Sequence, residues 1–155
     1  MLRHLAGLCV LSGAIAGAQQ APPRYLEYRL DGIVTRGGAV EAGLGAVIPM
    51  GTYTRLSLDG AAGPSWSHGT VSTAARVDAI GRFLLDPFRE TPVAVSLGGG
   101  VSVPYVEHGR VRPYLTAVVD VEGRRRKGVT PAVQLGVGGG ARVGVVLRTS
   151  PVRWR

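Results

Sequence analysis

The chain has 155 residues, a formal net charge of +8, 24 glycines and a single cysteine, and this length suits one domain. No internal apolar run approaches the roughly 20 residues that a transmembrane helix requires, which excludes a helical membrane protein. The arginines are scattered one at a time, often beside an Asp or Glu, so they do not form the continuous basic face that nucleic-acid-binding proteins use. We therefore expect no nucleic-acid partner.

The first 18 residues have the features of a cleaved export signal. Arg3 and His4 form a basic start, residues 5–16 are mostly apolar, and residues 16–18 form a small-x-small cleavage site. We predict a signal peptide over residues 1–18 and a barrel domain over residues 19–155, with cleavage after Ala16 as the alternative. Cys9 lies within the apolar stretch, so the mature chain has no thiol for a disulfide, a metal site or catalysis.

Turn-forming residues divide the rest of the chain into eight predicted strands. These cover residues 25–35, 38–48, 52–59, 70–85, 92–106, 110–121, 129–137 and 141–149. Most of them reach the roughly 9 to 11 residues that a tilted membrane strand requires. Eight is also the smallest strand number known for an outer-membrane barrel. The longest predicted connection covers residues 60–69.

Charged residues fall on one face of each predicted strand that carries them. Side chains alternate between the two faces of a strand, so Arg76, Asp78 and Arg82 share one face while Val77 and Phe83 share the other. The same alternation places these charged side chains on one surface of the sheet: Glu27, Arg29, Asp31, Glu41, Arg55, Asp59, Arg76, Asp78, Arg82, Arg112, Asp120, Arg142 and Arg148. The fifth and seventh predicted strands carry small or polar residues on this face, which leaves room for arginine side chains from other strands.

The two faces can be assigned in two ways. A soluble barrel hides its apolar face inside, as in a secreted lipocalin-like barrel that binds a small apolar ligand, whereas a membrane barrel turns that face outward. Both signs of charge recur in mid-strand, which favours the membrane barrel. We therefore predict an all-β fold, an eight-stranded antiparallel up-and-down transmembrane β-barrel with a polar, charge-paired lumen, and keep the lipocalin-like barrel as the alternative.

Outward-facing aromatic residues stand near the ends of the predicted strands, at the levels where membrane barrels carry aromatic girdles. With both termini in the periplasm, Tyr28 and Phe83 are expected at the periplasmic rim and Tyr105 at the outer rim. Trp66, in the long predicted loop, is expected to add to the outer belt.

On these features the chain from Tyr25 to Trp154 resembles the small eight-stranded outer-membrane barrels of the OmpA/OmpX type. The resemblance rests on architecture, namely the signal peptide, the alternating strands and the aromatic rims, and no diagnostic motif is matched. It implies an integral protein of a Gram-negative outer membrane with a structural or surface-interaction role. Its implied partners are outer-membrane lipids and, during biogenesis, the barrel assembly machinery.

Motifs that carry chemistry are weak in this sequence. Residues 136–141 fit the G-x-G-x-x-A dinucleotide fingerprint, but a strand rather than a helix follows, which favours a glycine hairpin turn. Ser65, Ser67, His68 and His108 lie in predicted outer loops without a nucleophile elbow, and two histidines are too few for a metal site. We expect no cofactor, no metal and no enzymatic activity. A lipid-modifying enzyme of the outer membrane is the least favoured hypothesis.

The predicted lumen and one basic turn complete the expectations. The interior of an eight-stranded barrel is just wide enough for its own side chains, so ion pairs should fill it and no large open pore is expected. Residues 124–127 form the only dense basic run and fall in a predicted periplasmic turn. This run is interpreted either as a solvated turn or as a contact with acidic headgroups or peptidoglycan.

Overall fold

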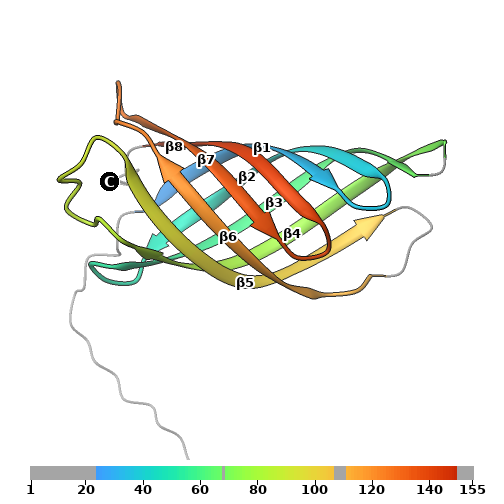
Figure 1. Cartoon of the computed structure of the whole chain (residues 1–155), viewed down its shortest axis with the longest axis horizontal. Coiled ribbons are helices and arrows are strands. Elements are labelled where there is room, and N and C mark those ends of the chain that lie inside the picture. Colours follow the sequence, from blue (N-terminus) through green and yellow to red (C-terminus); the bar gives the residue numbers. More distant parts are fainter. Residues whose placement is uncertain (1–23, 68, 107–110, 150–155) are drawn as a thin grey trace, which may run out of the picture.

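The structure is a computed structural model that describes residues 24–67, 69–106 and 111–149. These residues form eight β-strands that wind around a common axis (Figure 1). The strands are β1 (Tyr25–Val34), β2 (Gly38–Pro49), β3 (Thr54–Ser67), β4 (Thr70–Leu84), β5 (Ala94–Val106), β6 (Tyr114–Glu122), β7 (Val129–Val137) and β8 (Ala141–Thr149). The described residues include no helix long and apolar enough to cross a membrane. The predicted signal peptide lies outside the described residues.

Each strand pairs antiparallel with its neighbour in sequence, and β1 pairs with β8 to close the barrel. Closure gives every strand a paired neighbour on both sides, so the wall has no open edge strand. The start of β1 and the end of β8 lie at the same end of the barrel, which we call the terminal end. The β2–β3, β4–β5 and β6–β7 connections are also at the terminal end, and the β1–β2 and β7–β8 connections are at the other end, which we call the distal end (Figure 1).

Burial alternates residue by residue along the strands. In β8, Arg142, Val146 and Arg148 are buried while Val143 and Leu147 are exposed. This alternation follows from the pleat of a strand, which points successive side chains to opposite faces. The predicted all-β fold and the eight-stranded antiparallel barrel are therefore confirmed, with the charged face inside.

The largest difference from the prediction is in β3, which continues through most of the predicted loop at residues 60–69. Gly60, Gly63 and Pro64 favour turns locally, but β4 pairs with this whole segment up to the pair of Ser67 with Thr70. Gly63 and Pro64 have no paired residues on β2, so the β2–β3 ladder is interrupted there. Proline is compatible with such a break because it has no backbone N–H to donate. Trp66 therefore stands on a strand and not in a loop.

Several other boundaries differ from the prediction by a few residues, and those of β6 differ most. β6 begins at Tyr114 instead of residue 110 and continues to Glu122, one residue beyond its predicted end. Pro113 directly precedes this strand and has no N–H for the ladder. The glycine hairpin between β7 and β8 is confirmed, because Gly138, Gly139 and Gly140 have φ angles of 134°, 67° and 151°, which favour glycine.

Candidate functional site: the charged barrel interior

The interior of the barrel is lined by oppositely charged side chains. The described strands direct acidic side chains inward at Glu27, Asp31, Glu41, Asp59, Asp78, Asp120 and Glu122. They direct arginine side chains inward at Arg29, Arg55, Arg76, Arg82, Arg142 and Arg148. Apart from Arg55, whose side chain is 13% exposed, all of these residues are buried.

Arg29 of β1 lies in the middle of this set. Its Nε is 2.7 Å from Asp31 Oδ2, and its Nη1 is 3.0 Å from Asp59 Oδ2. Its Nη2 donates a hydrogen bond of 2.5 Å to Gln134 Oε1, and Gln134 in turn donates one of 2.7 Å to Asp120 Oδ1. Arg29 and Gln134 therefore join β1, β3, β6 and β7 across the lumen.

Arg76 of β4 extends the network toward the distal end. Its guanidinium contacts Asp31 at 2.6 Å, Asp78 at 3.1 Å and Glu41 at 3.3 Å. Arg142 of β8 reaches the same Asp78 at 2.6 Å. Asp31 is shared between Arg29 and Arg76, and Asp78 between Arg76 and Arg142, so charges taken out of water on β1, β2, β4 and β8 are compensated by direct contact.

Arg148 of β8 extends the network toward the terminal end. Its Nε is 2.8 Å from Glu27 Oε2, its Nη2 is 2.8 Å from Asp120 Oδ2, and its Nη1 is 2.6 Å from Glu122 Oε1. Arg82 of β4 lies 2.8 Å from the same Asp120. One arginine thus gathers three carboxylates from β1 and β6.

Interior glycines provide space for this network. A Cβ atom at Gly144 would overlap the carboxylate of Asp31, and a Cβ atom at Gly45 would overlap that of Asp59. On β7, an added Cβ at Gly136 would lie 3.3 Å from Arg142 Nε. Small residues in the lumen are therefore needed to fit the long charged side chains, as the sequence predicted for the fifth and seventh strands.

Arg112 is the predicted lumen residue that the structure does not place in the lumen. It precedes β6 and is exposed, because residue parity assigns a face only to a residue that lies within a strand. Glu122 was missed for the opposite reason. The prediction placed it in a turn, whereas it is the last residue of β6 and is 1% exposed. Glu122 lies two residues after Asp120 and therefore on the same face of the strand. This spacing could have identified it as a lumen residue.

The exterior of the barrel is apolar on every strand. Large aliphatic side chains point away from the wall, and Leu115 is 80% exposed. Other exposed members include Leu30, Leu44, Leu58, Val77, Leu97, Leu135 and Val145. An exposed apolar surface of this extent marks a face that contacts a membrane or another protein.

Exposed aromatic side chains stand toward both ends of this exterior. Phe83 stacks on Tyr53 near the terminal end, with ring centroids 5.8 Å apart. Tyr28, close to the start of β1, and Tyr105, close to the end of β5, are also exposed. Trp66 joins Tyr105 toward the distal end. The outward orientation predicted for Tyr28, Phe83 and Tyr105 agrees with these positions.

The residues considered for catalysis or metal binding do not form a site in the described part of the chain. Ser65 Oγ lies 2.9 Å from Ser72 Oγ, so its described side-chain partner is another hydroxyl. His68 and His108 lie outside the described residues. Within the residues described, no group of three or more His, Cys, Asp or Glu side chains is arranged to hold a metal ion.

The barrel is similar in structure to designed proteins. One, from the de novo design of transmembrane β-barrels, has a TM-score of 0.51 and 12% sequence identity, and the match covers 84% of this chain and 97% of the design. Another, the de novo designed TMB2.3 solved by solution NMR, has a TM-score of 0.48 and 15% identity, with 88% and 100% covered. No protein-family model and no curated protein matches the sequence. The first similarity supports the eight-stranded barrel fold.

Proposed function

We propose that this protein is an integral outer-membrane β-barrel with a structural or surface-interaction role, whose interior is closed by ion pairs and does not form a large open pore. The observation that carries this proposal is the inversion of polarity across the wall. Arg29 and Glu27 are buried in the lumen, while Leu30 and Leu44 on neighbouring strands are more than half exposed. A charged lumen and an apolar outer surface are both favourable when lipid surrounds the barrel.

Barrel closure supports the same proposal. Lipid offers no hydrogen-bond partners, so a sheet can cross a bilayer only when all of its edges are paired, as they are in this closed barrel. The shortest described strands, β6, β7 and β8, have nine residues each, which is about the length of a tilted membrane strand. Tyr28, Phe83 and Tyr105 would then be girdle residues at the two interfaces.

The lipocalin-like alternative requires the opposite arrangement of faces. A soluble barrel that binds an apolar ligand would turn Val and Leu inward and expose its charges to water. In the described strands the lumen contains the arginines and carboxylates, and Val143, Val145 and Leu147 point outward. This geometry is contrary to a lipocalin-like barrel.

Localisation in the outer membrane is part of the proposal and rests on the predicted signal peptide together with the barrel class. The partners would be outer-membrane lipids and, during biogenesis, the barrel assembly machinery. We propose no enzymatic activity, because the ion-paired interior offers charge compensation and no described nucleophile is paired with a base. Lipid A from a deletion strain tests the competing lipid-modifying hypothesis, and an altered acylation pattern restored by complementation would support it.

Fractionation after expression in a Gram-negative host tests the proposal directly. The protein should stay in the outer-membrane pellet after high-salt and alkaline washing, and its band should shift on a gel between unheated and boiled samples. Its N-terminal sequence should begin at Gln19. Recovery in the soluble fraction, or of intact Met1 in the inner membrane, would contradict the proposed location.

A further inference from the structure

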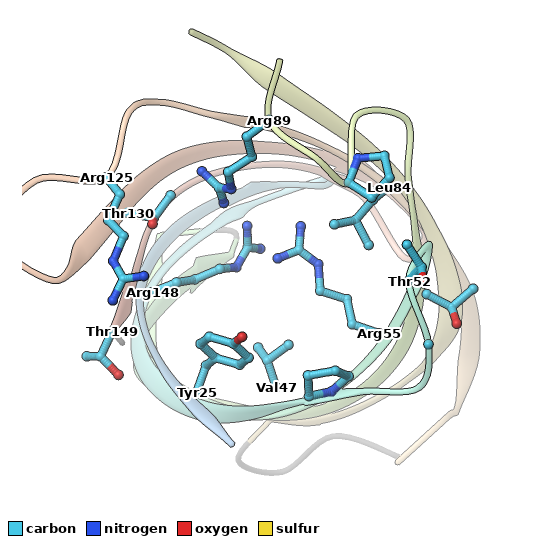
Figure 2. A pocket seen from close by; sticks show the side chains of 14 residues that line it. Tyr25, Val47, Thr52, Arg55, Leu84, Arg89, Arg125, Thr130, Arg148 and Thr149 are labelled. Atoms are coloured by element: carbon cyan, nitrogen blue, oxygen red, sulfur yellow. The ribbon is translucent and has the colours of Figure 1, made fainter. Parts of the chain in front are cut away.

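The terminal end of the barrel contains a cavity of about 290 Å³ surrounded by arginines. Four guanidinium groups line it, and each comes from a different element: Arg55 from β3, Arg89 from the β4–β5 connection, Arg125 from the β6–β7 connection and Arg148 from β8. Figure 2 shows Arg55 and Arg148 extending toward each other across the centre, with Arg89 approaching from the loop. None of the lining residues is acidic.

Three of these arginines, Arg55, Arg89 and Arg148, share the carboxylate of Glu122. Glu122 Oε1 accepts hydrogen bonds from Arg55 and, at 2.6 Å, from Arg148, and Oε2 accepts one of 2.6 Å from Arg89. Arg148 also contacts Glu27 and Asp120, whereas Glu122 is the described acidic partner of both Arg55 and Arg89. Each guanidinium group has five N–H donors, so Arg55 and Arg89 retain donors for an additional acceptor in the cavity.

Around the cavity, arginines outnumber the carboxylates that contact them. Glu27, Asp120 and Glu122 are contacted by Arg55, Arg82, Arg89 and Arg148, and Glu27 also lies 3.8 Å from Arg29. This group of side chains therefore has more positive than negative charges, and the basic turn at residues 124–127, which includes Arg125, adds positive charge nearby.

One buried donor and several hydroxyl groups of the cavity wall support a binding role. Arg55 Nε is buried and has no hydrogen-bond partner among the described residues, and an unsatisfied buried donor is costly. The hydroxyl groups of Thr52, Thr54 and Thr130 line the same cavity, and each can donate a further hydrogen bond. The wall of the cavity is therefore rich in donors.

The loop that carries Arg89 is held in place by several contacts. Asp86 accepts hydrogen bonds from the backbone amides of Glu90 at 3.1 Å and Thr91 at 3.0 Å, and Phe88 packs edge-on against Tyr53 with ring centroids 6.4 Å apart. Arg89 itself has a φ of 55°, a left-handed conformation that is uncommon for residues other than glycine. Strained backbone of this kind persists where the surroundings enforce it and is found at binding sites.

We propose that this cavity binds a phosphate-type anion, either free phosphate or the phosphomonoester of a lipid headgroup. Several guanidinium forks converge on one space with a local excess of positive charge, and this planar fork geometry matches phosphate oxygens in paired hydrogen bonds. The adjacent basic turn raises the local positive potential and attracts anions toward the opening. The site goes beyond the proposed structural role, because it gives the terminal end a specific ligand.

Titration of inorganic phosphate into the refolded barrel in a zwitterionic detergent tests this site. Isothermal titration calorimetry should show saturable binding to the unmodified protein and binding about tenfold weaker or more for Arg89→Gln, since one charge-assisted contact is lost. Arg36→Gln is the matched control. It removes the same charge from an exposed position in the distal β1–β2 connection, so its affinity should equal that of the unmodified protein.

A second variant and a second probe complete the test. Arg55→Gln should also weaken binding, and Arg89→Lys should retain part of it; a heat-shift gel confirms that each variant is folded. Titration of a short-chain phosphatidic acid distinguishes the two sources, because tighter binding than that of phosphate identifies a headgroup. The proposal is overturned if neither probe binds saturably, or if Arg36→Gln weakens binding as much as Arg89→Gln.

Discussion

Arg148 in the last strand forms an ion pair with Glu27 in the first, with Arg148 Nε 2.8 Å from Glu27 Oε2. The two residues are 121 positions apart in sequence and stand directly opposite each other in the register of β1 and β8. Their ion pair therefore lies on the seam where the barrel closes. Arg148 also holds Asp120 and Glu122 of β6, so it links closure of the wall to the lumen network.

Replacement of Arg148 by Met should destabilise the barrel strongly. The change leaves Glu27, Asp120 and Glu122 with fewer cationic partners, and removal of one partner from a buried ion pair costs about 3 to 5 kcal/mol. Urea unfolding in detergent, followed by the heat-shift gel, measures the loss. Arg148→Lys should lose less because the charge remains, and Arg36→Met should leave the midpoint unchanged. Equal midpoints for Arg148→Met and Arg36→Met would show that the network contributes little.

Single cysteines at positions 119 and 76 should report opposite environments. Val119 points outward and Arg76 inward, so in liposomes a label at position 119 should be quenched by probes attached to lipid tails, whereas one at position 76 should not. Cys9→Ser provides the cysteine-free background. Resistance of position 119 to water-soluble thiol reagents is a second readout. Lipid quenching at position 76 instead would reverse the two faces.

The refolded protein should not form a large, steady channel in planar bilayers. The interior of an eight-stranded barrel is only wide enough for its own side chains. Ion pairs occupy the described lumen, from the pair of Arg76 with Glu41 to the pair of Arg148 with Glu122. A sixteen-stranded porin in the same membrane is the positive control. Sustained currents of porin size from monomeric protein would mean that the assigned interior is wrong.

Gly144→Ala and Gly60→Ala should have opposite consequences for stability. A Cβ at Gly144 would collide with the Asp31 carboxylate inside the lumen, whereas a Cβ at Gly60 would meet no atom within 4 Å. Overpacking typically costs about 1 to 3 kcal/mol, while an alanine that fits the native backbone stabilises by about 0.4 to 1 kcal/mol. The urea unfolding midpoints of the two variants, each compared with that of the unmodified protein, measure these two effects. A Gly144→Ala midpoint at or above that of Gly60→Ala would contradict the packing described.

The β4–β5 loop should loosen in acid because of Asp86. Hydrogen bonds from the Thr91 and Glu90 backbone amides lower the pKa of the Asp86 carboxyl below its ordinary value of 3.8. Because the folded-state pKa of Asp86 is lowered, its contribution to the stability of the loop is complete at pH values above the ordinary pKa. This contribution is lost as the pH falls through the folded-state pKa. Amide exchange at Thr91 should therefore accelerate relative to the intrinsic rate as the pH is lowered below 3.8. Asp86→Asn should remove this dependence, and a carboxyl that titrates above its ordinary value would contradict it.

The pattern of residue types by itself determined which side chains face inward on most of the wall. Arg76 and Asp78 alternate with Val77 and Ala79, and a shift of one residue would move the whole charged row to the other face. Such a pattern is local, since it needs only the two-residue period of a strand. Turn-forming residues gave the number of strands, and charges of both signs in mid-strand indicated that this face is the interior, so these features were also predictable from local sequence.

Strand limits and ion-pair partners depended on the tertiary structure. Gly60, Gly63 and Pro64 favour a turn locally, but pairing with β4 extends β3 through them. Arg112 has the parity of a lumen residue but lies before the start of β6, whereas Glu122 lies within its end. The contact of Arg148 with Glu27 exists because β8 closes on β1 in one particular register. A sequence pattern specifies the face of a strand, but distances between side chains on distant strands arise only when the barrel closes and fixes their stagger.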